Sequence, residues 1–168
     1  MQNVLKTKTV FIVKKNKKYL IILTFILVHF FIINELKAQQ EEKIFLSLRN
    51  NEVNVRQGPD WNYPIKFVYK KKYLPVILID SYEIWRKVKD YENNSGWIHV
   101  SKLSKRKTGI NIKNQSILFS NPTVYSKPIA KLDKGRLILI KKCNKKWCKI
   151  STSKFVGWIK KEFIWGRT

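Results

Sequence analysis

Residues 85–98 read WRKVKDYENNSGWI, and residues 147–159 read WCKISTSKFVGWI. Each stretch begins with a Trp that opens a strand-like run and ends with a Gly-Trp-Ile triplet. An upstream segment corresponds as well, because residues 76–79 (VILI) match residues 137–140 (LILI). Self-similarity of this kind indicates that one small structural unit occurs twice. The sequence therefore predicts two tandem copies of one small domain, residues 44–106 and a more divergent copy over residues 107–168.

Short β-branched and aromatic runs separated by Gly, Pro, Asn and Asp fill the chain after residue 40, a pattern typical of strands and tight turns. Many short strands in a unit of roughly 60 residues predict an all-β fold, here two tandem small β-barrels. The expected strands are residues 44–48, 53–56, 65–69, 75–82, 86–90 and 96–100, and then 110–112, 116–119, 129–132, 136–142, 148–151 and 157–160.

Large aromatic side chains can enlarge the core of so small a domain. We therefore expect four Trp residues to lie in the two cores: Trp85, Trp97, Trp147 and Trp158. Gly96 and Gly157 each precede one of these Trp residues and are expected to let the backbone approach a neighbour closely. The basic residues 102–107 are the expected seam between the copies, and Trp165-Gly166 is expected to cover an open barrel end.

The first 38 residues have the three parts of a secretory signal peptide. Residues 1–18 carry six Lys and no acid, residues 19–33 are apolar apart from Thr24 and His29, and Leu36-Lys37-Ala38 places a small residue before Gln39. The apolar run is shorter than the roughly 20 residues that a spanning helix needs. The sequence predicts a hydrophobic signal helix and export, to the periplasm in a Gram-negative cell. The alternative is an uncleaved membrane anchor.

The chain carries a formal net charge of +24, from 29 Lys and 6 Arg against 11 acids. The second copy is the more basic, with 15 Lys and Arg against 2 acids. One interpretation is contact with an anionic envelope polymer or membrane surface. The other is the residue bias of AT-rich codons, which the excess of Lys over Arg favours, because specific recognition of phosphate or carboxylate usually uses the planar Arg fork.

Residues 53–59 (VNVRQGP) and 62–64 (NYP) resemble the opening strand and loop of the bacterial SH3-like (SH3b) domain family. Residues 74–76 (LPV) and 96–99 (GWIH) follow in the order that the family shows. The resemblance implies extracytoplasmic binding modules tied to the cell wall or to peptide ligands. Residues 57–60 are expected to form a turn through Gly58 and Pro59, braced by Arg56. The second copy has Phe119 and Asn121 where the first has Arg56 and Gly58.

Reactive side chains are scarce in the two copies, which contain one His and two Cys. Cys143 and Cys148 flank a predicted hairpin turn at residues 144–146, so a disulfide is expected in an exported protein. A structural zinc site needs four ligands, and His99 lies in the other copy from both Cys. The sequence predicts no metal, no cofactor and no enzymatic activity, and export argues against nucleic acid as a partner.

An aromatic loop is the best candidate for ligand binding, because Trp61 and Tyr63 follow the predicted turn. Trp61 could instead pack over the barrel mouth or against the second copy. Three further residues are expected to line the same groove: Tyr69, Tyr73 and Tyr82. The sequence predicts a non-enzymatic exported module that binds peptidoglycan or a peptide segment of an envelope protein. The alternative is electrostatic adhesion of a basic protein to an anionic envelope polymer or membrane surface.

Overall fold

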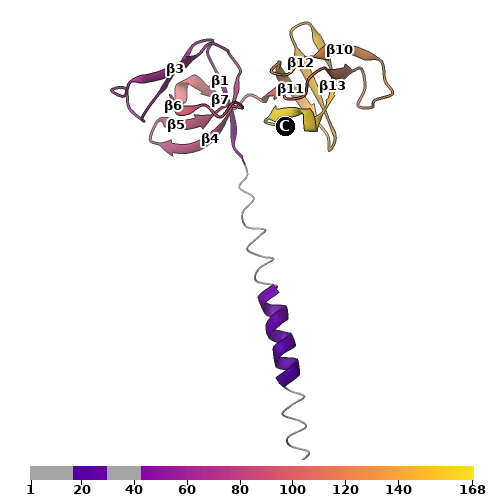
Figure 1. Ribbon diagram of the computed structural model, residues 1–168. Helices are drawn as coiled ribbons and strands as arrows, with labels where there is room; N and C mark the ends of the chain where they lie inside the picture. Colours follow the sequence, from indigo (N-terminus) through magenta and orange to yellow (C-terminus); the bar gives the residue numbers. More distant parts are fainter. Residues whose placement is uncertain (1–16, 30–42) are drawn as a thin grey trace, which may run out of the picture. The chain divides into compact units, whose positions relative to one another are not determined.

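The computed structural model describes residues 17–29 and 43–168 (Figure 1). Residues 17–29 form a helix, and no helix in the described ranges is both long and apolar enough to cross a membrane. The expected cleavage site at residues 36–38 lies outside the described residues. Residues 43–168 form one compact unit that consists of two antiparallel sheets.

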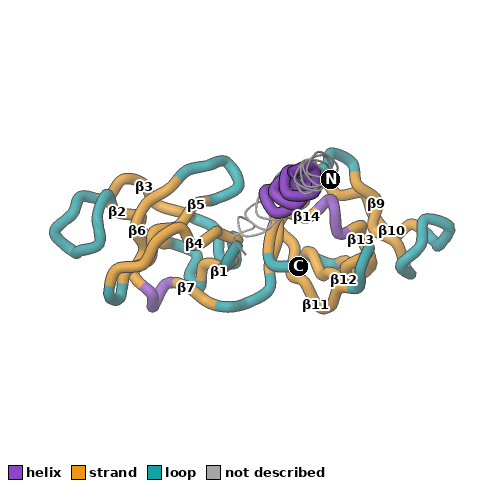
Figure 2. The backbone as a smooth tube through the Cα atoms, turned by 90° about the horizontal axis from the view of Figure 1, so that it is seen from below, coloured by secondary structure: helices purple, strands orange, loops and turns teal. Residues whose placement is uncertain are grey.

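The first sheet contains seven strands in the order β3-β2-β6-β5-β4-β1-β7. A short 3-10 turn, Val100–Lys102, precedes its last strand (Figure 2). The strands are β1 (Phe45–Leu48), β2 (Val53–Arg56), β3 (Ile65–Tyr69), β4 (Pro75–Tyr82), β5 (Trp85–Lys89), β6 (Ser95–His99) and β7 (Leu103–Ser104).

The second sheet also contains seven strands, in the order β10-β9-β13-β12-β11-β8-β14. This order is that of the first sheet with seven added to each number, and a 3-10 turn, Lys161–Phe163, again precedes the last strand. The strands are β8 (Thr108–Asn111), β9 (Ser116–Phe119), β10 (Pro128–Leu132), β11 (Leu137–Cys143), β12 (Trp147–Thr152), β13 (Phe155–Lys160) and β14 (Ile164–Gly166). The topology therefore repeats as the sequence does.

Aliphatic residues, rather than Trp, make up most of each core. The first core includes Val55, Val88 and Ile98, and the second includes Ile150 and Ile159, all of them fully buried. They lie at alternate positions of their strands, because side chains of a strand point to opposite faces in turn. The same alternation decides where the Trp residues lie.

Two of the four Trp residues expected in the cores lie elsewhere. Trp85 and Trp147 are buried, at 4% and 9% exposure. Trp97 and Trp158 are only half-buried, because each lies between a buried Gly and a buried Ile in β6 or β13. The period of two sends the Ile of each Gly-Trp-Ile triplet into the core and turns the Trp to the other face.

At Gly96 and Gly157 a neighbouring strand leaves no room for a side chain. A Cβ atom added at Gly96 would lie 2.4 Å from Val55 Cγ1 and 2.9 Å from the Arg56 carbonyl oxygen. One added at Gly157 would lie 2.6 Å from the carbonyl oxygen of Phe119. Any side chain at these positions would therefore push β2 away from β6, or β9 away from β13.

The seam between the sheets is shorter than residues 102–107, because β7 takes up Leu103 and Ser104 and β8 begins at Thr108. The two sheets also pack together, since Ile110 of the second sheet is buried within the first core. Trp165 belongs to the second sheet. It lies in β14, paired with β8, and its indole meets the Phe45 ring edge-on at 5.1 Å between ring centroids.

The expected disulfide between Cys143 and Cys148 is present. The two residues are direct cross-strand partners at the end of the β11–β12 hairpin. Asn144 closes the turn between them, because its Oδ1 accepts hydrogen bonds from the amides of Lys146 and Trp147 at 2.9 and 2.7 Å. The bond therefore closes a short loop on a hairpin that already has its own hydrogen bonds.

Gly96→Ala is expected to lower the free energy of unfolding by about 1–3 kcal/mol, the usual cost of an overpacked core. Chemical denaturation of the full chain measures it. Ser95→Ala, one residue earlier, is the control and should stay within about 0.5 kcal/mol of wild type. Equal effects of the two changes would contradict the close approach of β2 to β6.

Replacing both cysteines by Ser is expected to cost about 2 kcal/mol of stability, because the bond restricts a short loop of the unfolded chain. Thiol titration of the denatured wild type should find no free thiol before reduction. Reductant should destabilise wild type by the same amount and leave the double variant unchanged. A double variant as stable as oxidised wild type would exclude a stabilising role for the bond.

Candidate functional site

Hydrogen bonds to backbone atoms hold the loop between β2 and β3 in its conformation. The Gln57 amide donates to the Pro64 carbonyl at 3.1 Å, which closes the base of the loop. At its tip, Asp60 Oδ1 accepts from the Asn62 amide at 2.8 Å. Arg56 Nη1 donates to the Tyr63 carbonyl at 2.7 Å, the bracing contact expected of this residue. Hydrogen bonds within the loop and to Arg56 therefore fix its conformation.

Gly58 is required here because the Tyr63 ring lies against its backbone. A Cβ atom added at Gly58 would lie 2.5 Å from Tyr63 Cζ. Tyr63 thus packs within its own loop, with 47% of its surface still exposed. Trp61, two residues earlier, contacts Trp85 and His99 of the β5–β6 hairpin.

Trp61 is the exposed member of a group of three aromatic rings, with 57% of its surface accessible. Its ring meets the Trp85 ring at 4.8 Å between centroids and 68° between planes. It stacks on the His99 ring at 5.1 Å and 30°. The Arg56 guanidinium lies 5.4 Å from the Trp61 centroid, within the range of a cation–π contact. Trp61 is therefore held by three neighbours while more than half of its surface stays accessible.

A cavity of about 260 Å³ opens beside these rings. Both signs of charge line it, since Glu52 and Lys102 join Arg56 at its wall. His99 Nδ1 accepts a hydrogen bond from the Ser101 amide at 3.2 Å, so the neutral ring carries its proton on Nε2. The cavity is lined by Glu52, Asn54, Arg56, Trp61, Trp85, His99 and Lys102. We call this cavity and its lining the Trp61 groove.

The three tyrosines expected in this groove are not part of its lining. Tyr69 donates to the Asp90 carboxylate at 3.0 Å, and Tyr73 lies beside the second sheet. Tyr82 is exposed near the β4–β5 turn. Tyr69 and Tyr82 lie in β3 and β4, and Tyr73 lies in the loop that joins them, so none of the three belongs to the β2–β3 loop that holds Trp61.

His99 also belongs to the groove, although from the sequence it was considered only as a zinc ligand. It lies directly opposite Trp85 in the β5–β6 hairpin. Cross-strand partners are the closest side-chain neighbours in a sheet. The pairing of Lys89 with Ser95 centres the turn on residues 90–94, and this hairpin register is the signal that could have found His99.

The buried Asp90 organises the far end of the same hairpin. Its Oδ1 accepts from the amides of Glu92 and Asn94, both at 2.9 Å, and its Oδ2 accepts from the Tyr69 hydroxyl and the Asn94 side chain. Burial, and then the nearby Asp90 carboxylate, raise the pKa of Tyr69 well above its ordinary value. Tyr69 thus stabilises the hairpin that positions Trp85 and His99.

The second sheet carries a different surface at the position equivalent to the groove. Trp147 pairs with Lys160, as Trp85 pairs with His99. Phe119, which replaces Arg56, meets Trp147 edge-on at 5.7 Å. A cavity of about 610 Å³ lies here, lined by Lys145, Lys146, Trp147, Lys160, Lys161, Glu162, Ile164 and Thr168. The same framework thus presents Lys160 in place of His99 and Phe119 in place of Arg56.

A family model described as "Bacterial SH3 domain" matches the chain twice, over residues 49–105 and 113–166. The chain belongs to the bacterial SH3 domain family. The two matches fall on the two sheets and together cover more than half of the chain, so it contains two tandem bacterial SH3 domains. No curated protein matches the chain.

Solved structures resemble the chain only distantly. The structure of NlpC2 from Trichomonas vaginalis has 15% identity and a TM-score of 0.36 over 77% of this chain and 50% of that one. NlpC1 from the same organism has 14% identity and a TM-score of 0.35 over 75% and 46%. The chain spans about half the length of each. At such low TM-scores, the two structures say nothing about what this chain binds.

Tyr69→Phe is expected to lower the free energy of unfolding by about 2 kcal/mol, because the hydroxyl donates to a carboxylate. In the unfolded chain, the Tyr69 hydroxyl has the ordinary pKa of 10.0. Because the pKa is raised in the folded chain, the folded chain keeps the hydroxyl proton at a pH where the unfolded chain has lost it. Stability from this group is therefore complete below pH 10.0 and decreases as pH rises above it.

Denaturation at several pH values tests this prediction. The difference in stability between wild type and Tyr69→Phe should be constant at neutral pH and should shrink above about pH 10. Tyr82→Phe, which removes an exposed hydroxyl, is the control. A difference that stays constant or grows at alkaline pH would contradict the link between Tyr69 and Asp90.

Proposed function

We propose that the chain is a non-enzymatic, exported binding protein whose Trp61 groove recognises peptidoglycan or a peptide segment of an envelope protein. Membership of the bacterial SH3 domain family supports the part of this proposal that concerns binding. The observation that carries it is Trp61 itself, which is 57% exposed although two rings and a guanidinium hold it in place.

The shape and chemistry of the groove suit an extended ligand. A flat indole face can stack on a sugar ring or on a peptide side chain, and exposed aromatic anchors dominate many interfaces. Arg56 and Lys102 can bind a carboxylate, while Glu52 can bind an amino group. Peptidoglycan stems carry both groups. The SH3-like barrel that we infer for each sheet would offer this groove at the side of the sheet, open to a polymer.

Export is supported by two features of the chain. Residues 17–29 are helical within the basic and apolar leader, as a signal helix would be. The Cys143–Cys148 disulfide fits an oxidising compartment, where such bonds persist. The absence of enzymatic activity is part of the proposal, and the bonded state of both cysteines supports it, because neither offers a thiolate nucleophile.

The second candidate function is electrostatic adhesion to an anionic envelope polymer or membrane surface. The cavity beside Trp147 favours it, because four Lys side chains line that cavity and only Glu162 opposes them. Glu162 lies 3.4 Å from Lys160, with both side chains largely exposed. Such exposed charges attract polyanions without a shaped contact, so this binding would weaken steeply with salt.

Trp61→Ala is expected to reduce retention of the full chain on purified sacculi by about thirtyfold, as when an interface loses an anchor of about 2 kcal/mol. The assay is a pull-down from neutral detergent at several salt concentrations. Tyr125→Ala is the matched control, because Tyr125 is an aromatic residue of the second sheet with 95% of its surface exposed.

Retention that resists salt and is lost only in Trp61→Ala would support recognition through the groove. Retention that falls steeply with salt and is equal in both variants would favour electrostatic adhesion instead. No retention above that of an unrelated protein of equal net charge would exclude peptidoglycan. Crosslinking from position 61 in intact cells would then test whether the groove binds a peptide segment of an envelope protein. This alternative is excluded if position 61 forms no adduct with an envelope protein.

A further inference from the structure

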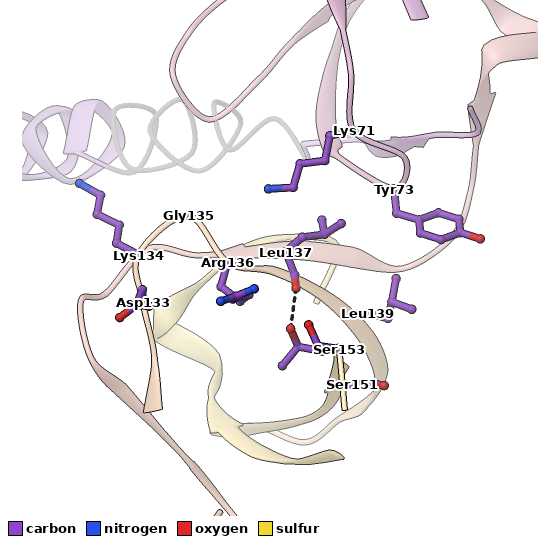
Figure 3. A pocket seen from close by; sticks show the side chains of 11 residues that line it. Lys71, Tyr73, Asp133, Lys134, Gly135, Arg136, Leu137, Leu139, Ser151 and Ser153 are labelled. Carbon is purple, nitrogen blue, oxygen red and sulfur yellow. Dashed lines mark hydrogen bonds between the residues drawn. The ribbon is translucent and has the colours of Figure 1, made fainter. Parts of the chain in front are cut away.

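A second cavity, of about 490 Å³, lies where the first sheet meets the second (Figure 3). Lys71 and Tyr73 reach it from the loop between β3 and β4. The turn before β11 and the turn after β12 form the opposite wall. Its lining is Lys71, Tyr73, Asp133, Lys134, Gly135, Arg136, Leu137, Leu139, Ser151, Thr152 and Ser153. The volume lies within the range of about 300–1,000 Å³ that is usual for small-molecule sites.

Three cations line this cavity without a carboxylate partner. Among the described residues, the ion pairs are Lys70–Glu52 and Lys160–Glu162. Lys71, Lys134 and Arg136 therefore have no carboxylate oxygen within 4.0 Å in that part of the chain. Asp133 lines the same cavity, so the net charge of the lining is positive and close to two units. A doubly charged anion would balance it.

The wall that carries Arg136 is fixed from beneath by one buried side chain. Asn111 is fully buried, and its Nδ2 donates to the Asp133 carbonyl at 2.8 Å and to the Leu132 carbonyl at 3.0 Å. Gly135, with φ of 82°, donates its amide to the Asn111 carbonyl at 2.8 Å. The turn that presents Lys134 and Arg136 is therefore held in one conformation.

The facing wall is fixed as well. Tyr73 has φ of 66°, and its amide donates to the Leu48 carbonyl at 2.9 Å. The Arg106 guanidinium lies 4.7 Å from the centroid of the Tyr73 ring. Leu137 packs against the core of the first sheet, which ties the two walls together. The backbone segments that carry Lys71 and Arg136 are thus both held in place without a ligand.

Hydroxyl and apolar groups complete the lining. Ser151 lies near the end of β12 and Ser153 in the turn that follows, and Thr152 between them uses its hydroxyl to donate to the Leu137 carbonyl at 3.0 Å. Leu137, Leu139 and the Tyr73 ring supply apolar surface. The cavity therefore combines cations and hydroxyls with a surface that an organic group can contact.

We propose that this cavity binds an organic phosphomonoester, with Arg136 and Lys71 contacting the phosphate oxygens and Leu137, Leu139 and Tyr73 contacting the organic group. A phosphomonoester carries a charge of roughly −1.5 to −2 at pH 7, which matches the lining. The Arg fork suits two phosphate oxygens at once, and Arg is scarce in this Lys-rich chain. A single carboxylate would leave one positive charge unbalanced.

Amide NMR of the full chain in neutral detergent tests the proposal, with glycerol 3-phosphate as the soluble probe. Titration should shift the Gly135 and Ser153 amides along a saturating curve. Lys71→Gln combined with Arg136→Gln should raise the Kd about tenfold or more, because two charge-assisted contacts are lost. Lys127→Gln combined with Lys131→Gln is the matched control, since it removes the same charge from exposed positions on the other side of the second sheet.

A second arm replaces the soluble probe by phosphatidic acid in the micelles, with phosphatidylcholine as its control. Saturation only with phosphatidic acid would identify a lipid headgroup as the source of the phosphate, and saturation with glycerol 3-phosphate would identify a soluble one. The proposal is overturned if neither probe saturates, or if the control pair weakens binding as much as the cavity pair. Retention on sacculi is independent of this result, so the two proposals can fail separately.

Discussion

In each domain, the strand that carries the Gly-Trp-Ile triplet lies close against the second strand of that domain. Gly96 lies against Val55 and the Arg56 carbonyl, and Gly157 lies against the Phe119 carbonyl. Only a residue without a side chain allows this approach. The approach joins the β5–β6 hairpin to β2, which brings Arg56, and through it the Trp61 loop, alongside Trp85 and His99. The groove thus depends on a contact that lies behind it.

Two sheets with one topology carry surfaces of different chemistry. Opposite a buried Trp, the first sheet places His99 and the second places Lys160. Position 56 is Arg, and its counterpart Phe119 packs on Trp147 instead of bracing a loop. Since the aliphatic cores hold the framework in both, substitutions at these rim positions change the surface at little cost to the fold. The groove of the first domain is aromatic and mixed in charge, whereas the equivalent cavity of the second domain is lined mainly by Lys.

Packing of the two sheets creates surfaces that neither sheet has alone. Ile110 and Leu137 extend the first core into the second sheet, and Trp165 contacts Phe45. This packing places Lys71 and Tyr73 opposite the turn of Arg136, more than 60 residues later in the chain. Among the described residues, Lys71, Lys134 and Arg136 have no carboxylate oxygen within 4.0 Å, so the cavity keeps its positive charge.

The sequence by itself determined the all-β class, the duplication, most strand positions and the disulfide, because these follow from local alternation, turn residues and spacing. It also singled out Trp61 as a candidate for ligand binding. Tertiary structure alone decided which side chains surround Trp61 and that Trp97 and Trp158 lie outside the cores. It also decided that Tyr69 binds Asp90 and that Tyr73 lines the cavity between the sheets. The physical reason is that a strand pattern states which residues share a face, whereas only pairing and twist decide what that face meets.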